Sequence, residues 1–255
     1  MRLHVYPDRR LMSAAAAAHA AALLRRIVGE RGAARVVAAT AASQLEFQQH
    51  LVREPDVPWT AIELFQLDEY IGLPHDHPAA FRTALVRNLV GPAGISRCHF
   101  IDATNPESSR AALNGLLATA DIDVAFLGIG ENAHLAFNDP PADFGTRDPY
   151  IVVTLDEACR RQQVGEGWFA TLEDVPKTAV SMSIAQMMRA REILVIVPDL
   201  RKAAAVRAAL EANISPAVPA SILRTHPHVT MYLDEAAASR LSPDTLRLHS
   251  DVPPG

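Results

Sequence analysis

The sequence predicts an α/β fold in which one mostly parallel sheet carries helices on both faces. Short apolar runs alternate with helical stretches along nearly the whole chain. The run VAFLGI, at residues 124–129, is too apolar for a sheet face open to water, as expected of a buried parallel strand. No long linker or internal repeat divides the sequence. We therefore expect a Rossmann-like, doubly wound sheet in a single domain.

The expected elements follow one another as strands separated by helices. Strands are predicted at residues 2–7, 35–40, 62–68, 99–103, 124–129, 150–155, 178–184, 192–198 and 229–235. Helices are predicted at residues 13–30, 43–53, 78–90, 106–120 and 200–212. The domain is expected to span residues 1–241, with residues 242–255 as a loosely ordered C-terminal tail.

Composition excludes several classes of function. The chain has 255 residues and a formal net charge of −5, with no run of basic residues, which argues against binding to nucleic acid or an anionic membrane. Its two cysteines have no paired or metal-ligating spacing, so we expect no metal and a reducing compartment. The alanine-rich run near the N-terminus is predicted to be a packed helix and not a membrane span. We expect a soluble, cytoplasmic protein.

The most informative run is FLGIGENAHLAFNDPP, residues 126–141, which raises two interpretations. Gly128-x-Gly130-x-x-Ala133 satisfies the dinucleotide fingerprint, but that fingerprint requires a helix to begin at once. Two prolines at 140 and 141 oppose a long helix there. We therefore favour a loop held open for chemistry and expect no bound cofactor.

In that loop, His134 is a candidate for proton transfer near neutral pH. Asp139 is close enough in sequence to orient the imidazole, and Asn132 is a further hydrogen-bonding candidate. Gly128 and Gly130 would let the backbone approach a ligand. The alternative is a purely structural histidine, and the sequence leaves both interpretations open.

Other strand ends carry further candidates, because ligands bind at the carboxyl ends of strands in such sheets. Asp68 and Glu69 follow the third predicted strand, where a carboxylate suits a general base, or alternatively a turn or helix cap. Ser43 begins a helix where a phosphate or an ordinary N-cap would fit. Lys202 lies in the first turn of a helix, where a bound anion would explain a positive charge.

Together these segments resemble the glucosamine-6-phosphate deaminase family, within a wider group that includes 6-phosphogluconolactonases. The family pattern LDEYxGL corresponds to LDEYIGL at residues 67–73, and GIGxNGHIAFNEP corresponds to GIGENAHLAFNDP at 128–140. The blocks at residues 175–184, 201–210 and 219–234 resemble later family blocks in the same order. The resemblance extends over roughly residues 2–234.

The resemblance implies an isomerisation coupled to deamination, without metal or cofactor. By similarity, His134 opens the sugar ring with Asp139 as its orienting acid, and Asp68 moves a proton from C2 to C1. The products would be fructose 6-phosphate and ammonia. Candidate substrate-binding and phosphate-binding residues are Thr40, Ala41, Ala42, Ser43, Glu69, Gly128, Gly130, Arg160, Arg161 and Lys202. The partner would be a small sugar phosphate, bound by a monomer or a homo-oligomer.

The sequence departs from the family pattern at the phosphate site. The glycine-rich ATGSTP loop of the family reads ATAASQ here, and the arginine that precedes a phenylalanine pair is absent from CRRQQVGEGWF. Arg160 matches an upstream family arginine, and Arg161 is a candidate substitute. Two alternatives therefore stand beside the deaminase: a hydrolase of the 6-phosphogluconolactonase type, and a non-catalytic sugar-phosphate sensor.

Overall fold

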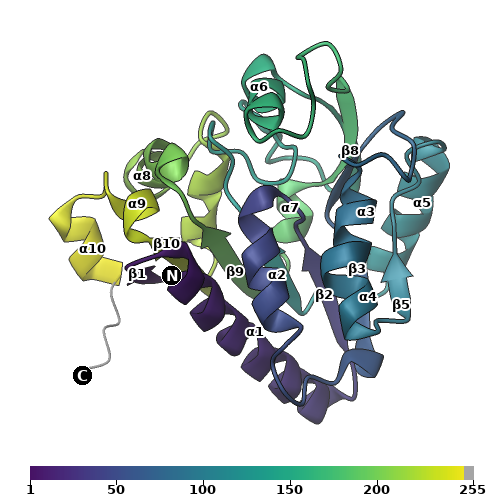
Figure 1. The fold of residues 1–255 in the computed structure, drawn as a ribbon, viewed down its shortest axis with the longest axis horizontal. Coiled ribbons are helices and arrows are strands. Elements are labelled where there is room, and N and C mark those ends of the chain that lie inside the picture. The colour runs from purple at the N-terminus through teal and green to yellow at the C-terminus, as the bar shows by residue number, and fades with distance from the viewer. Residues whose placement is uncertain (250–255) are drawn as a thin grey trace.

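The computed structural model describes residues 1–249, which form one seven-stranded parallel sheet and a smaller antiparallel sheet (Figure 1). The large sheet has the order β1 (Arg2–Tyr6), β10 (Val229–Asp234), β9 (Glu192–Val197), β6 (Val124–Leu127), β2 (Ala34–Ala38), β3 (Ile62–Gln66) and β5 (Arg97–His99). All of its neighbouring strands pair in parallel. The predicted Rossmann-like architecture is confirmed.

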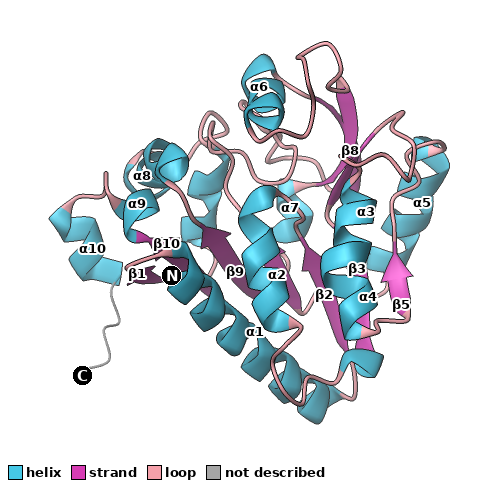
Figure 2. Cartoon of the chain, viewed as in Figure 1, coloured by secondary structure: helices cyan, strands magenta, loops and turns pink. Residues whose placement is uncertain are grey.

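Helices cover both faces of this sheet (Figure 2). The α-helices are α1 (Arg9–Arg31), α2 (Leu45–Leu51), α3 (Phe81–Leu85), α4 (Gly91–Ala93), α5 (Pro106–Leu117), α6 (Glu157–Gly165), α7 (Ile184–Met187), α8 (Ala203–Glu211), α9 (Glu235–Ala238) and α10 (Pro243–His249). Short turns of other helix types are η1 (Ala42–Gln44), η2 (Trp59–Ala61), η3 (Val86–Val90), η4 (Leu200–Lys202) and η5 (Pro219–Thr225).

The strands bury alternate residues in two separate cores, as expected when both faces of a sheet are covered. On β2, Val36 packs with α1 and α2, whereas Val37 belongs to the core on the opposite face, with α5 and α8. On β6, Phe126 and Ala125 divide in the same way. The sheet is therefore a rigid central layer whose strand ends hold fixed positions.

Helix α1 is the alanine-rich segment, and it begins at Arg9 because the Asp8 side chain accepts a hydrogen bond from Leu11 N. Among the residues that the structure describes, it is the one helix long and apolar enough to cross a membrane by length and composition. Its alanines at 16, 17, 20 and 21 are buried against the sheet. The prediction of a packed helix is confirmed.

The strand order reverses between β2 and β6. From β2 the chain adds β3 and then β5 towards one edge, and it returns to place β6, β9 and β10 on the other side of β2. The crevice at such a reversal is where doubly wound sheets bind their ligands. The residues after β2, β6 and β9 therefore meet at one edge of the sheet.

The smaller sheet corrects the expected pairing of two predicted strands. β7 (Tyr150–Thr154) and β8 (Thr178–Met182) are strands as predicted, but they pair antiparallel with each other, and β8 pairs antiparallel with β4 (Asp68–Tyr70). β7 alternates buried and more exposed positions, which suits a sheet with one open face. Figure 1 shows β8 of this sheet beyond the carboxyl ends of the large sheet.

The C-terminal tail was predicted to be loosely ordered, and for residues 243–249 that prediction is wrong because α10 forms there. Ser242 Oγ accepts a hydrogen bond from Thr245 N, which caps the first turn. Thr245 Oγ1 donates to Glu211 Oε1 on α8, 2.9 Å away, and so fastens the helix to the domain. The remaining residues of the predicted tail, 250–255, lie outside the described part of the chain.

Candidate active site

A pocket opens at the carboxyl ends of β2, β3 and β6, beside η4. Its walls combine backbone of the strand-end loops with a few polar side chains. The lining residues are Ala39, Thr40, Ala41, Ser43, Leu67, Asp68, Phe81, Gly128, Ile129, Gly130, His134, Ala136, Phe137, Gln162, Gln163 and Lys202. The predicted candidates His134, Asp68 and Lys202, far apart in sequence, therefore line one cavity.

The histidine loop follows β6 and folds back on itself. Gly130 N donates to the carbonyl of His134 at 3.0 Å, and a Cβ added to Gly130 would lie 2.2 Å from His134 Nε2. Ala133 and Ala136 both adopt left-handed backbone, with φ of 67° and 52°. No helix begins at Gly130, so the dinucleotide interpretation is excluded and Gly130 instead makes room for the imidazole.

The imidazole of His134 is oriented by an acid, as predicted. Its Nδ1 lies 2.9 Å from Oδ1 of Asp139, and both side chains are buried. Burial alone would raise the pKa of Asp139, but the contacts with His134 and the hydrogen bonds from Asp156 N and Asn132 lower it below its usual value. Asp139 is therefore a buried carboxylate in its charged form, and Nε2 is the edge of the ring left for a substrate.

Asn132 connects this pair to the backbone around it. Its Nδ2 donates to Asp139 Oδ1 and to Asp156 Oδ2, each at 3.1 Å, and its Oδ1 accepts from the backbone N–H of His134 at 3.2 Å. Asp156 in turn caps the N-terminus of α6. The predicted residue Asn132 thus supports the acid and the histidine from behind the pocket.

The far end of the histidine loop is fastened to the small sheet. Asn138 Nδ2 donates to the carbonyls of Leu135 and Met182, both at 2.9 Å, and Phe137 N donates to Ser181 Oγ at 3.1 Å. These contacts are buried, where satisfied hydrogen bonds hold a single conformation. Neither Asn138 nor Ser181 was predicted, because the contacts that join this loop to the small sheet connect residues more than forty positions apart in the sequence.

Asp68 begins β4, the strand that leaves the end of β3 for the small sheet. Asp68 is 5% exposed and lines the pocket. Burial, and then the neighbouring charge of Glu69, raise its pKa well above the ordinary aspartate value. A carboxylate whose pKa moves towards neutrality is suited to taking a proton from carbon and returning it.

Glu69 does not line the pocket, contrary to the prediction that it binds substrate. Its carboxylate accepts hydrogen bonds from the backbone N–H groups of Phe81 and Arg82 at 3.1 and 2.8 Å, at the start of α3. Gln66 Nε2 donates both to Glu69 Oε2 and to the carbonyl of Asp68, each at 2.9 Å. Glu69 is therefore a helix cap, the alternative that the sequence left open, and with Gln66 it fixes the backbone beside Asp68.

The loop after β2 supplies the opposite wall. Thr40, Ala41 and Ser43 line the pocket as predicted, whereas Ala42 does not and turns its carbonyl to the Arg9 guanidinium. The Thr40 hydroxyl oxygen is buried and has no hydrogen-bond partner among the described residues. A buried donor without a partner is costly, so this hydroxyl is available to a ligand.

Lys202 projects into the pocket from η4. The residue before this turn, Asp199, has φ of 90°, and its N–H donates to both carboxylate oxygens of Asp234 at 3.1 and 3.0 Å. Lys202 is only 4% exposed. Burial lowers the pKa of its ammonium group, and the nearby carboxylates of Glu166 and Glu131 oppose that shift.

Arg160 and Arg161 do not reach the pocket, contrary to prediction. Arg160 donates to the carbonyls of Val175 and Leu172, and Arg161 pairs with Glu157 on the exposed side of α6. The two glutamines that follow them line the pocket instead. Helix α6 was not predicted, and without its phase the sequence could not show which side chains of CRRQQ face inward.

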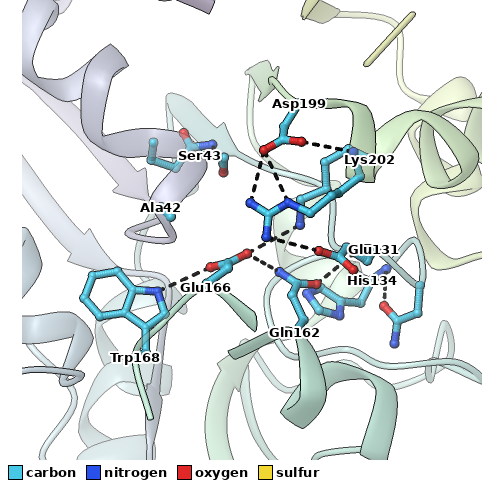
Figure 3. A network of polar contacts seen from close by, with 12 residues as sticks. Ala42, Ser43, Glu131, His134, Gln162, Glu166, Trp168, Asp199 and Lys202 are labelled. Carbon is cyan, nitrogen blue, oxygen red and sulfur yellow. Dashed lines mark hydrogen bonds and ion pairs between the residues drawn. The ribbon is translucent and has the colours of Figure 1, made fainter. Parts of the chain in front are cut away.

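Figure 3 shows the polar network around Lys202. Glu166 lies 3.7 Å from Lys202 Nζ and accepts hydrogen bonds from Gln162 Nε2 at 2.8 Å and Trp168 Nε1 at 3.3 Å. Glu131 approaches the neighbouring Arg201. Glu166 was not predicted as part of the site, although in the sequence it stands near the place where the family has an arginine before a phenylalanine pair.

One group of potential metal ligands lies behind the pocket, formed by His134, Asp139 and Cys159, with ligand atoms within 4.8 Å of one another. Burial, and then the charges of Asp139 and Asp156, raise the pKa of the Cys159 thiol far above its usual value. Metal binding needs a thiolate. Asp139 already accepts from Asn132 and from Asp156 N. These residues therefore fit a hydrogen-bonded network better than a metal site.

Comparison with known proteins identifies the group to which the sequence and the fold are similar. A family model described as glucosamine-6-phosphate isomerases/6-phosphogluconolactonase matches residues 7–232. The glucosamine-6-phosphate deaminase of Streptococcus pyogenes serotype M18 is 33% identical over 213 residues, covering 83% of this chain and 89% of the relative. That of Lactobacillus delbrueckii subsp. bulgaricus is 32% identical over 216 residues, with the same coverage of 83% and 89%.

Solved structures agree with these relatives. A monomeric glucosamine-6-phosphate deaminase superposes with a TM-score of 0.86 at 29% identity, over 94% of this chain and 100% of that one. The 6-phosphogluconolactonase of Trypanosoma brucei superposes with a TM-score of 0.79 at 17% identity, over 94% of this chain and 98% of that one. The second likeness shows a shared fold.

Proposed function

The chain belongs to the family of glucosamine-6-phosphate isomerases and 6-phosphogluconolactonases, and on that premise we propose that it is an amino-sugar-phosphate deaminase. It would convert glucosamine 6-phosphate, or a closely related amino sugar phosphate, to fructose 6-phosphate and ammonia. The observation that carries this proposal is the presence of Asp68 and His134 in one pocket. A reaction that opens a ring and then moves a proton between carbons needs both groups.

Ring opening is the step that we assign to His134. With Nδ1 held by Asp139, Nε2 can take the proton of the sugar's anomeric hydroxyl and return a proton to the ring oxygen as the ring bond breaks. Asp139 stabilises the imidazolium formed in between, because its own charge is maintained by its contacts in the fold. The product of this step is the open-chain aldehyde.

Proton transfer between C2 and C1 is the step that we assign to Asp68. Its carboxylate removes the C2 proton to form an enolamine and then delivers a proton to C1, which leaves an imine at C2. Water adds to this imine, and ammonia departs as the ketone of fructose 6-phosphate forms. Burial of Asp68 supports the role, because a base shielded from water holds its geometry and keeps the abstracted proton.

The substrate's phosphate would lie between the loop after β2 and Lys202. Thr40 offers a buried hydroxyl without a hydrogen-bond partner in the described part of the chain, Ser43 offers a second hydroxyl, and Lys202 offers the positive charge. Gln162 and Gln163 would provide neutral amide contacts from α6. Hydrogen bonds to a charged group of this kind typically contribute about 1.5–3 kcal/mol each.

We also propose a cytoplasmic enzyme that binds no nucleic acid and no membrane. The two cysteines, Cys98 and Cys159, are free, which suits a reducing compartment. The net charge of −5 gives no attraction to anionic polymers or lipids. Either a monomer or a homo-oligomer is compatible with this proposal.

The test is ammonia release from glucosamine 6-phosphate, with fructose 6-phosphate measured in parallel. The proposal predicts equal amounts of both products from the wild type and none from Asp68→Asn. Turnover that survives Asp68→Asn would contradict the role of Asp68. Hydrolysis of 6-phosphogluconolactone without ammonia release would identify a lactonase, and ligand-dependent thermal stabilisation without any turnover would identify a sensor.

A further inference from the structure

The positive charge of the pocket is already paired with an acid of the protein. Lys202 is the only lysine or arginine among the described residues that line the pocket. Its Nζ lies 3.7 Å from Oε1 of Glu166, and the two side chains are 5% and 4% exposed. The net charge of this buried pair is zero, so the proposed phosphate site has no uncompensated cation.

Glu166 is held in this position by two side-chain hydrogen bonds to its carboxylate. Gln162 Nε2 donates to one carboxylate oxygen and Trp168 Nε1 to the other. All of these side chains point at the same carboxylate in Figure 3. The acid is therefore an ordered part of the site and not a flexible surface residue.

The pair itself is loose. A direct charge-assisted hydrogen bond between an ammonium and a carboxylate measures about 2.7–2.9 Å, whereas Lys202 and Glu166 are 3.7 Å apart. The lysine side chain has several rotatable bonds and can turn its ammonium group towards a second anion without movement of the backbone. Exchange of one anion for another at Lys202 therefore needs little rearrangement.

A phosphate monoester carries a charge of about −1.5 to −2 at pH 7. In the pocket it would attract Lys202 and at the same time be repelled by Glu166, in a place where burial reduces the screening of charges. Glu166 and the phosphate thus compete for one ammonium group. The competition acts only on ligands that carry a negative charge.

We propose that Glu166 is a specificity-determining residue, an internal counter-ion from which the phosphate of the substrate must draw Lys202. The proposal rests on the proposed function for the identity of the substrate. Glu166 sets the affinity of the pocket for anions, and with it the KM, while the reacting groups Asp68 and His134 set kcat. An amino sugar without a phosphate does not compete with Glu166 for Lys202.

The test compares Glu166→Gln with the wild type and with Glu157→Gln. Glutamine keeps the size of the side chain and removes its charge, and Glu157 supplies the matched loss of one charge on the exposed side of α6. We expect Glu166→Gln to lower the KM for glucosamine 6-phosphate by about tenfold, with kcat within about twofold. The inhibition constant of inorganic phosphate should fall by a similar factor, and Glu157→Gln should change neither constant.

A KM or phosphate inhibition constant that is unchanged or higher in Glu166→Gln would overturn the proposal, because it would leave Glu166 with a structural role only. An equal gain for glucosamine, which lacks the phosphate, would overturn it as well. The rise in Tm caused by inorganic phosphate is measured alongside, and it should be larger in Glu166→Gln than in the wild type. This readout needs no turnover and tolerates a destabilised variant, so it separates failure of this inference from failure of the proposed function.

Discussion

The two ends of the pocket differ in whether their buried polar groups have hydrogen-bond partners within the protein. At the reacting end, Asp139 contacts His134 and accepts hydrogen bonds from Asn132 and from Asp156 N, and Gln66 fixes the backbone of Asp68. At the phosphate end, Thr40 Oγ1 and Gln163 Oε1 are buried without hydrogen-bond partners within residues 1–249. In the free protein the acid that orients His134 has its hydrogen-bond partners, whereas these two polar atoms at the phosphate end do not.

This difference indicates what each end is built to do. Catalytic groups must hold their geometry before the substrate arrives, and satisfied buried networks hold a single arrangement. A binding end gains affinity when the ligand supplies partners that the protein lacks, since unpaired buried polar atoms are costly. Substitutions at the two ends should therefore separate effects on kcat from effects on KM.

The largest effect is expected from Gly130→Ala, which breaks the reacting end. The added Cβ would lie 2.2 Å from His134 Nε2, so the imidazole must move away from Asp139 and from the substrate. A misplacement of about 1 Å costs on the order of a hundredfold in rate, and we expect at least that loss in kcat. Steady-state kinetics would show it, with KM changed less.

The matched control is Gly145→Ala in an exposed part of the following loop. There the added Cβ would come no closer than 3.4 Å, to Asp143 Oδ1, so wild-type kinetics are expected. Full activity in Gly130→Ala would contradict the requirement for space beside the imidazole.

The phosphate end should respond through KM. Thr40→Val replaces the buried hydroxyl, which has no hydrogen-bond partner among residues 1–249, by a methyl group of similar size. Loss of one hydrogen bond to a charged phosphate should raise KM by about tenfold or more and leave kcat nearly unchanged. The free energy of unfolding without ligand should stay the same or rise, because no hydrogen bond of the free protein is lost.

Ser181→Ala gives the contrasting result in the free protein. Ser181 Oγ accepts from Phe137 N at 3.1 Å and from Asn138 Nδ2 at 3.3 Å, and it donates to the carbonyl of Met182 at 3.2 Å. Its removal leaves buried groups unpaired and should cost about 1–3 kcal/mol of stability. Denaturant unfolding of Thr40→Val and Ser181→Ala measures the contrast. Equal destabilisation of the two variants would contradict the difference in hydrogen bonding between the two ends of the pocket.

The smallest effect is a gain in stability from Asp68→Asn. Burial raises the pKa of Asp68 in the folded state, so its contribution to stability is full below the unfolded pKa of about 4 and is lost as the pH rises towards the folded pKa. Asparagine does not ionise and avoids this loss. At pH 7 we expect a Tm higher by about 2–4 °C, the shift that about 1 kcal/mol brings in a domain of this size.

The comparison of Tm at pH 7 and pH 4 checks the sign, because the advantage of Asp68→Asn should shrink as the pH falls. Asp76→Asn, at an exposed position, is the control. In the wild type, kcat/KM should decrease as the pH falls through the raised pKa of Asp68, since the base must be ionised. A lower Tm for Asp68→Asn at pH 7 would contradict the assignment of a destabilising buried carboxyl.

Much of this architecture follows from local patterns in the sequence. Alternating strands and helices predicted the parallel sheet, and the rule that ligands bind at strand ends led to Thr40, Asp68, His134 and Lys202, all of which line the pocket. The family resemblance supplied their roles. Local patterns suffice here because each of these residues lies in the segment that follows an apolar strand.

The errors come from contacts between distant parts of the chain. Glu69 caps a helix that begins twelve residues later, and Arg161 faces solvent because of the phase of a helix that was not predicted. β7 and β8 were predicted as strands, but the antiparallel pairing of β8 with β4 joins segments more than one hundred residues apart. Periodicity identifies an element and does not identify its partner.

The role of Asp68 as a shielded proton carrier is the central claim, and the fate of a deuterium at C2 tests it most directly. Glucosamine 6-phosphate deuterated at C2 is converted in ordinary water, and the C1 of the fructose 6-phosphate is examined by mass spectrometry. Because Asp68 is only 5% exposed, the abstracted deuterium should exchange slowly with solvent, and part of it should appear at C1. Complete absence of deuterium from C1 would contradict the claim.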